Sequence, residues 1–163
     1  MAGDQERLSL RDADAIDVGY VTDFHILLRA IHEAMPPDAV LFLEGPGTAP
    51  AIADFLHRHA ASEAPLMEAN SRHPTDRFHI PLRHLAALLL LAEDHPSPEI
   101  AFHLAVHRDR EVLLWAHDAG FGRVLVARSL SDDAIERFRD ALGAAIRSPK
   151  RHGLLSLFRT RDH

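Results

Sequence analysis

Three histidines and an aspartate are concentrated in one short segment of this chain. The segment 99–143 reads EIAFHLAVHRDREVLLWAHDAGFGRVLVARSLSDDAIERFRDALG and carries His103, His107 and the dipeptide His117-Asp118. Histidine binds metal ions and exchanges protons near neutral pH. On a helix, a spacing of four residues would bring His103 and His107 together on one zinc ion. The secondary structure of the segment therefore decides between a metal site and other chemistry.

The alternation of residue types around His103 predicts a strand. Apolar residues at positions 100, 102, 104 and 106 alternate with alanine and histidine at 101, 103, 105 and 107, which is typical of a half-buried strand. Four residues of extended chain separate the Cα atoms of His103 and His107 by about 13 Å. The two histidines then cannot bind one ion, and we predict neither a metal site nor a cofactor.

A two-residue turn at Asp109-Arg110 predicts the register of a hairpin. With this register Leu104 faces Trp115, so that Trp115 anchors the core face of the sheet and His117 shares that face. The other face is predicted to carry His103 and His107.

Asp118 is the predicted diagonal neighbour of His103 across this hairpin, at about 7–8 Å between backbones. A carboxylate in that position favours the protonated imidazole and fixes its tautomer, as a base and its orienting group require. His103 and Asp118 are therefore the candidate catalytic pair. An ordinary cross-strand polar pair is the alternative that this pattern favours.

The spacing of apolar residues predicts the other helices and strands, and proline and glycine residues indicate where they end. The expected helices cover 23–35, 49–60, 82–95 and 131–143, with Thr22, Thr48 and Ser131 as N-caps and Gly143 as a stop. The expected strands cover 39–45, 77–82 and three runs of a meander within 99–127. The sequence therefore predicts an α+β protein, with helices packed on a mixed or mostly antiparallel sheet that includes a three-stranded C-terminal meander followed by a helix.

Composition divides the 163 residues into three parts. We expect residues 1–18 to be a loosely ordered acidic lead-in, residues 19–146 to form one globular α+β domain, and residues 147–163 to be a basic amphipathic tail. The tail carries a net charge of +4, so the first 146 residues carry −10 of the overall −6. An acidic body repels phosphate backbones, which argues against nucleic acid as a partner.

The chain has no cysteine, and no apolar run approaches the roughly 20 residues that span a membrane. The polar, acidic N-terminal residues lack a signal-peptide pattern. We therefore expect a cytoplasmic protein that is not an integral membrane protein. The 13 histidines would add positive charge below neutral pH, although scattered surface histidines produce the same composition.

Two segments carry apolar residues that either pack within the subunit or form an interface. The helix over 85–92 is either covered on all sides or exposes one face to a second subunit, and the basic tail either docks back onto the acidic body, which its charge favours, or binds a partner. The run LAALLLLA (85–92) has one apolar stripe for the core, and Leu90 and Leu91 lie outside that stripe. In the basic tail the apolar residues lie between arginines; they include Leu154, Leu155 and Phe158. These five residues are the candidate interface residues, and a two-fold homodimer is the expected assembly.

Three functional hypotheses follow. The leading one is a non-catalytic cytoplasmic binding or regulatory module that acts through protein–protein contacts, with a homodimer as its expected form, because no complete catalytic constellation is present. The alternative is a small enzyme that uses His103 and Asp118 as an acid–base or metal-assisted pair. A further alternative is an acidic partner that neutralises a basic protein.

Overall fold

The computed structural model describes residues 6–45, 49–68, 76–117 and 122–147. Within these residues the α-helices are α1 (Phe24–Ala34), α2 (Pro50–His59), α3 (Leu85–Ala92) and α4 (Asp132–Leu142). The strands are β1 (Ala15–Val21), β2 (Val40–Glu44), β3 (Arg77–Pro81), β4 (His103–Arg108), β5 (Glu111–Ala116), β6 (Arg123–Ala127) and β7 (Ile146–Arg147). Short 3₁₀ turns cover Asp12–Asp14, Leu82–His84, Ser97–Glu99 and Gly143–Ala145.

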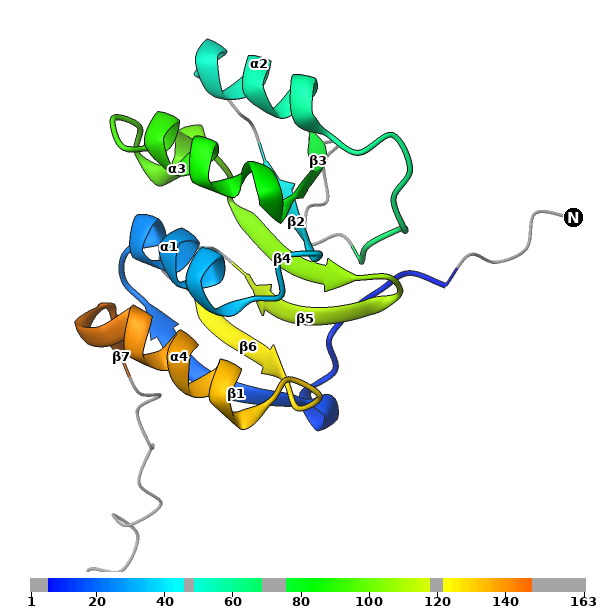
Figure 1. Ribbon diagram of the computed structural model, residues 1–163, viewed down its shortest axis with the longest axis vertical. Coiled ribbons are helices and arrows are strands. Elements are labelled where there is room, and N and C mark those ends of the chain that lie inside the picture. Colours follow the sequence, from blue (N-terminus) through cyan, green and yellow to red (C-terminus); the bar gives the residue numbers. More distant parts are fainter. Residues whose placement is uncertain (1–5, 46–48, 69–75, 118–121, 148–163) are drawn as a thin grey trace, which may run out of the picture.

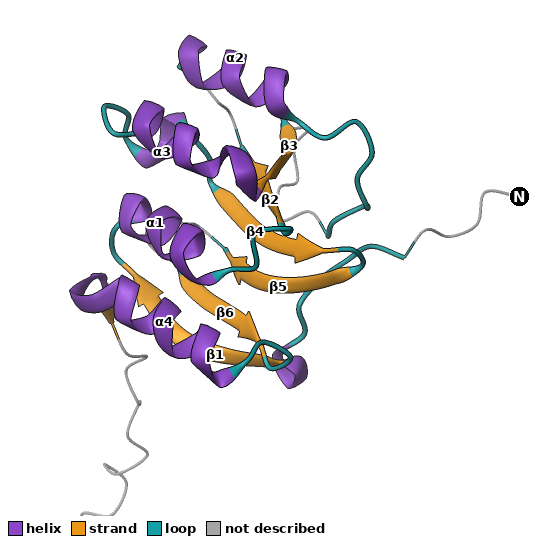
Figure 2. Cartoon of the chain, viewed as in Figure 1, coloured by secondary structure: helices purple, strands orange, loops and turns teal. Residues whose placement is uncertain are grey.

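All seven strands join one antiparallel sheet, in the order β3-β2-β4-β5-β6-β1-β7. Strands β4, β5 and β6 form the predicted meander, and α4 follows it (Figure 2). The predicted α+β class is therefore confirmed.

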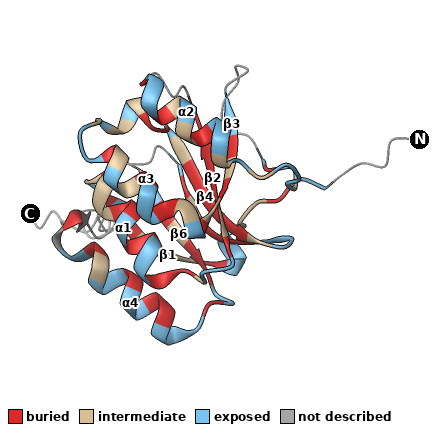
Figure 3. Ribbon diagram, turned by 45° about the horizontal axis from the view of Figure 1, so that its top comes forward, coloured by how far each residue is buried: buried red, intermediate tan, exposed pale blue. Residues whose placement is uncertain are grey.

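The four helices lie in the row α2-α3-α1-α4 over one face of the sheet (Figure 1). The main core fills the space between this row and the sheet, and it includes fully buried side chains from both layers, such as Leu27, Ile80, Leu88, Val126 and Phe138. Figure 3 shows buried residues on the inner sides of the helices and along the strands behind them. The helices thus cover one face of the sheet, and no α-helix of the described residues covers the opposite face.

Capping residues explain where α1 and α4 begin. The Asp23 side chain accepts hydrogen bonds from the backbone of His25 and Ile26, so the N-cap of α1 is Asp23, one residue after the predicted cap Thr22. The Thr22 hydroxyl instead donates to the backbone oxygen of Ala145. Ser131 caps α4 as predicted, and Gly143 follows its last residue.

Strand β1 is an element that the sequence pattern does not predict. It lies largely within residues 1–18, where only a lead-in is expected. A register shift between Asp17 and Gly19 interrupts its pairing with β6, and Gly19 has a φ of +113°. This irregularity breaks the two-residue alternation that identifies a strand.

The β4–β5 hairpin has the predicted turn but not the predicted register. Arg108 pairs with Glu111 as expected, but a bulge beyond this pair places Trp115 opposite Ala105. Trp115 therefore packs on the face away from the helices, in a second apolar cluster with Phe42 and Met67. The predictions that Trp115 anchors the main core and that Leu104 faces it are wrong, because one extra residue reverses the faces.

Candidate functional site

The candidate site lies on the sheet face opposite the helices. Strands β3 and β4, on either side of β2, present His79 (β3) and His103 and His107 (β4) on this face, beside residues of the second apolar cluster. The N-terminal segment covers part of the face, because Leu8 pairs with Met67 and is itself buried. Histidines far apart in the sequence therefore share one partly covered surface.

His79 and His107 form a hydrogen-bonded pair across β2. The Nδ1 atom of His79 lies 2.9 Å from Nε2 of His107, and the two rings meet edge to face with centroids 5.1 Å apart. Val40 pairs with His107 and Phe42 pairs with His79, so both histidines flank the same central strand. The His79 ring also packs on the Phe42 ring, with centroids 5.0 Å apart.

Both histidines of this pair are neutral at neutral pH. Burial, and secondarily the neighbouring His107, lower the pKa of His79 to about 4. Burial also lowers the pKa of His107. Since burial in a low-dielectric environment disfavours a charge, the pair consists of one donor and one acceptor rather than two imidazolium ions.

The direction of this hydrogen bond follows from the other nitrogen of His107. His107 is 3% exposed, and its Nδ1 atom has no hydrogen-bond partner among the described residues. A buried N–H without an acceptor is rarer in proteins than an acceptor without a donor. This favours the tautomer in which the proton of His107 is on Nε2 and is donated to Nδ1 of His79, so that the proton of His79 is on its own Nε2.

A second pair, His103 and His117, forms at the opposite end of β4. Their rings stack with centroids 4.6 Å apart and planes 6° from parallel. The predicted placement of His117 on the face opposite His103 is wrong, because the hairpin bulge brings both onto the same face. Asp118, the predicted partner of His103, lies outside the described residues.

Glu44 is a functional candidate that the sequence pattern does not single out. It is 1% exposed, and its register neighbours are Arg77 on β3 and His103 on β4. The only sequence signal is its position at the end of an apolar strand, VLFLE. A buried carboxylate beside histidines is an arrangement found at both structural and catalytic sites. Among the described residues, however, no three His, Asp or Glu side chains gather closely enough to hold a metal ion.

A pocket of about 380 Å³ adjoins His79. Its sheet side consists of Phe42, Arg77 and His79. Its other walls come from the N-terminal segment and the loop after α2: Arg7, Ala61, Ser62, Ala64, Pro65, Leu66 and Met67. The pocket on this part of the face is thus lined by His79 and not by the candidate His103.

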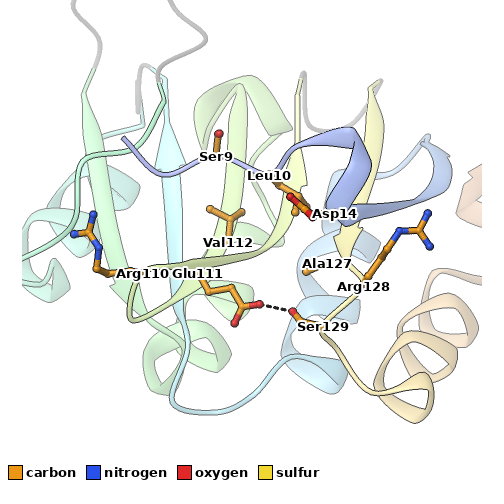
Figure 4. Close-up of a pocket in the computed structure, with 9 residues that line it drawn as sticks. All are labelled: Ser9, Leu10, Asp14, Arg110, Glu111, Val112, Ala127, Arg128 and Ser129. Carbon is orange, nitrogen blue, oxygen red and sulfur yellow. Dashed lines mark hydrogen bonds between the residues drawn. The ribbon is translucent and has the colours of Figure 1, made fainter. Parts of the chain in front are cut away.

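A second pocket, of about 330 Å³, lies beside the β4–β5 turn. Figure 4 shows its lining, in which Glu111 points toward Ser129 and accepts a hydrogen bond from its hydroxyl, while the guanidinium groups of Arg110 and Arg128 point away from Glu111. Asp14 also lines this pocket, so two carboxylates accompany the two arginines. The two negative and two positive charges of the lining cancel, so the lining favours neither an anionic nor a cationic ligand.

The helix layer carries an apolar groove between α2 and α3. It is lined by Phe55, Ala51, Ala87, Leu90 and Leu91, with Asp54 and Arg58 beside them. Leu90 is 71% exposed, whereas Leu91 is half-buried and packs against the core. The other interface candidates, Leu154, Leu155 and Phe158, lie outside the described residues.

Comparisons of the chain with protein-family models, with curated proteins and with solved structures find no match. No helix in the described ranges is both long and apolar enough to cross a membrane.

Proposed function

We propose that this chain is a non-catalytic cytoplasmic module that acts through protein–protein contacts, and that a second copy of the chain docks on the α2–α3 groove. The observation that carries the proposal is the exposure of Leu90. A leucine that is 71% exposed beside Phe55 and Leu91 leaves apolar area in water, and burying a leucine side chain stabilises a complex by about 1.5–3 kcal/mol.

The charges beside the groove favour a second copy as its occupant. Asp54 and Arg58 are exposed and lie one helical turn apart on α2. A two-fold axis that passes between these two residues, perpendicular to α2, would place Asp54 of each copy opposite Arg58 of the other. Such self-complementarity is the property that a two-fold interface requires.

A cytoplasmic location accompanies this proposal, because the chain has no cysteine and so does not depend on an oxidising compartment for disulfides. The enzyme hypothesis with His103 and Asp118 has less support, since the adjoining pocket is lined by His79 instead. The hypothesis of an acidic neutralising partner rests on net charge alone.

Sedimentation velocity over a range of concentrations tests the proposed dimer. We expect the wild-type protein to dimerise and Leu90→Glu to weaken the dimer at least about tenfold, because each copy would bury an unpaired carboxylate. Leu66→Glu is the matched control, since Leu66 is 50% exposed but lies away from the groove, and it should leave the dimer unchanged.

Two results would count against the proposal. One is a wild-type protein that remains monomeric up to about 100 μM, a concentration at which a functional homodimer would assemble. The other is a dimer that Leu90→Glu leaves intact, which would place the interface elsewhere.

A further inference from the structure

The pocket beside His79 differs from the rest of this acidic protein in its charge. Arg7 and Arg77 line it, and none of its lining residues is acidic. Neither guanidinium forms an ion pair with another described residue. Two guanidinium groups on one pocket without an acidic lining residue, in a chain with a net charge of −6, form a cationic patch that attracts an anion, although the buried Glu44 is the register neighbour of Arg77.

His79 adds a neutral hydrogen-bond donor to these cations. In the tautomer that the unpartnered Nδ1 of His107 favours, Nδ1 of His79 accepts from His107 and the proton of His79 is on Nε2. No described residue accepts a hydrogen bond from this Nε2 atom. The buried partner therefore leaves His79 with an N–H that is available to a ligand oxygen.

The remaining lining residues are apolar apart from Ser62, and the backbone holds them in place. They are Phe42, Ala61, Ala64, Pro65, Leu66 and Met67. The Ala61 N–H donates to the His79 carbonyl at 2.7 Å, and Leu8 exchanges hydrogen bonds of 2.8 Å with Leu66 and Glu68. Since these bonds tie the loop to β3 and to the N-terminal segment, the pocket is formed before any ligand enters.

We infer that this pocket binds a small organic carboxylate with a flat apolar body. Arg77 and Arg7 would hold the carboxylate, which accepts paired hydrogen bonds from a guanidinium. The Nε2–H of His79 would donate to a carboxylate oxygen, and the apolar body would pack on Leu66 and Pro65, which are more exposed than the other large apolar residues of the lining. The inference is independent of the proposed dimer, because the pocket and the α2–α3 groove lie on opposite sides of the sheet.

The test is a calorimetric titration of the full-length protein at pH 7 with three probes: 1-naphthoate, the neutral 1-naphthamide and inorganic phosphate. We expect 1-naphthoate to bind with a dissociation constant below about 1 mM. The amide lacks the charge and phosphate lacks the apolar body, so each should bind at least about tenfold more weakly.

Matched variants locate the site. Arg77→Gln should weaken naphthoate binding at least about tenfold, whereas Arg83→Gln, at an exposed arginine outside the pocket, should not change it. His79→Phe should weaken binding several-fold, since it keeps a flat ring but removes the donor. Circular dichroism of each variant shows that it is folded.

Four outcomes would overturn the inference. They are the absence of naphthoate binding at about 1 mM, equal binding of the naphthoate and its amide, equal binding of naphthoate and phosphate, and equal affinities of the Arg77→Gln and Arg83→Gln variants. The second would show that charge is not recognised, the third that the apolar walls contribute nothing, and the fourth that binding occurs elsewhere.

Discussion

Nδ1 of His79 lies 2.9 Å from Nε2 of His107, although 28 residues separate the two histidines in the chain. The strand order β3-β2-β4 brings them together, because β2 inserts between the strands that carry them. Their burial keeps both imidazoles neutral. A buried polar pair of this kind links the pH of the solution to the stability of the fold.

We predict that the fold loses stability as the pH falls from about 6.5 toward 4. The pKa of His79 is about 4 in the folded state, whereas an unfolded histidine titrates near 6.5. Below pH 6.5 the unfolded chain therefore binds more protons than the folded chain, and the free energy of unfolding decreases. Because His79 is partly exposed to solvent, we expect a loss of roughly 1–2 kcal/mol from this pair. Urea unfolding at several pH values measures it.

His107→Leu provides the control for this pH dependence. Leucine has a similar volume and needs no hydrogen bond, but it leaves Nδ1 of His79 without its partner, so at pH 7 we expect the variant to be less stable than the wild type by roughly 1–2 kcal/mol. Between pH 6.5 and 4 the variant should lose less stability than the wild type. If the two pH profiles are parallel, the pair does not contribute to the acid sensitivity, and the other histidines cause it.

A second prediction concerns the cap of α1. Asp23→Ala removes the acceptor for two backbone N–H groups and should destabilise the fold by about 1 kcal/mol. Asp23→Asn keeps a capping oxygen and should lower the free energy of unfolding by only a few tenths of a kcal/mol. Thermal unfolding of the two variants compares them, and an equal loss in both would show that the charge of Asp23, rather than its cap, stabilises the helix.

The helix layer was predictable from sequence to a larger extent than the candidate site. Helix periodicity and caps such as Ser131 act within one turn, so local residues suffice to predict α4 and its neighbours. The bulge in β5 is different, because it depends on how well the whole hairpin packs. One extra residue there moves Trp115 to the other face and brings His117 beside His103.

The pairing of His79 with His107 depends on contacts between segments that are farther apart in the sequence than the two strands of the hairpin. It requires the order of three strands, which no local pattern in the sequence determines. The apolar run 85–92 leaves open whether Leu90 is covered or exposed. The two-layer architecture decides this, because a helix that is apolar on all sides then has one face outside the core.

A third prediction tests the charge pairs proposed for the dimer. Asp54→Arg alone would place two arginines opposite each other and should weaken dimerisation several-fold, and Arg58→Asp alone should do the same with two carboxylates. The double variant restores opposite charges across the two-fold axis and should regain most of the affinity. Sedimentation velocity at low salt measures all three, and additive losses in the double variant would contradict this pairing.

The most direct test of the central claim is whether the α2–α3 grooves of two copies meet in solution. Because the chain has no cysteine, Ala87→Cys in the groove and Glu136→Cys on the exposed side of α4 each introduce one thiol. With a short bismaleimide at micromolar protein concentration, we predict covalent dimers of Ala87→Cys and almost none of Glu136→Cys. Equal cross-linking of the two variants, or none of Ala87→Cys in a protein that sediments as a dimer, would contradict the claim.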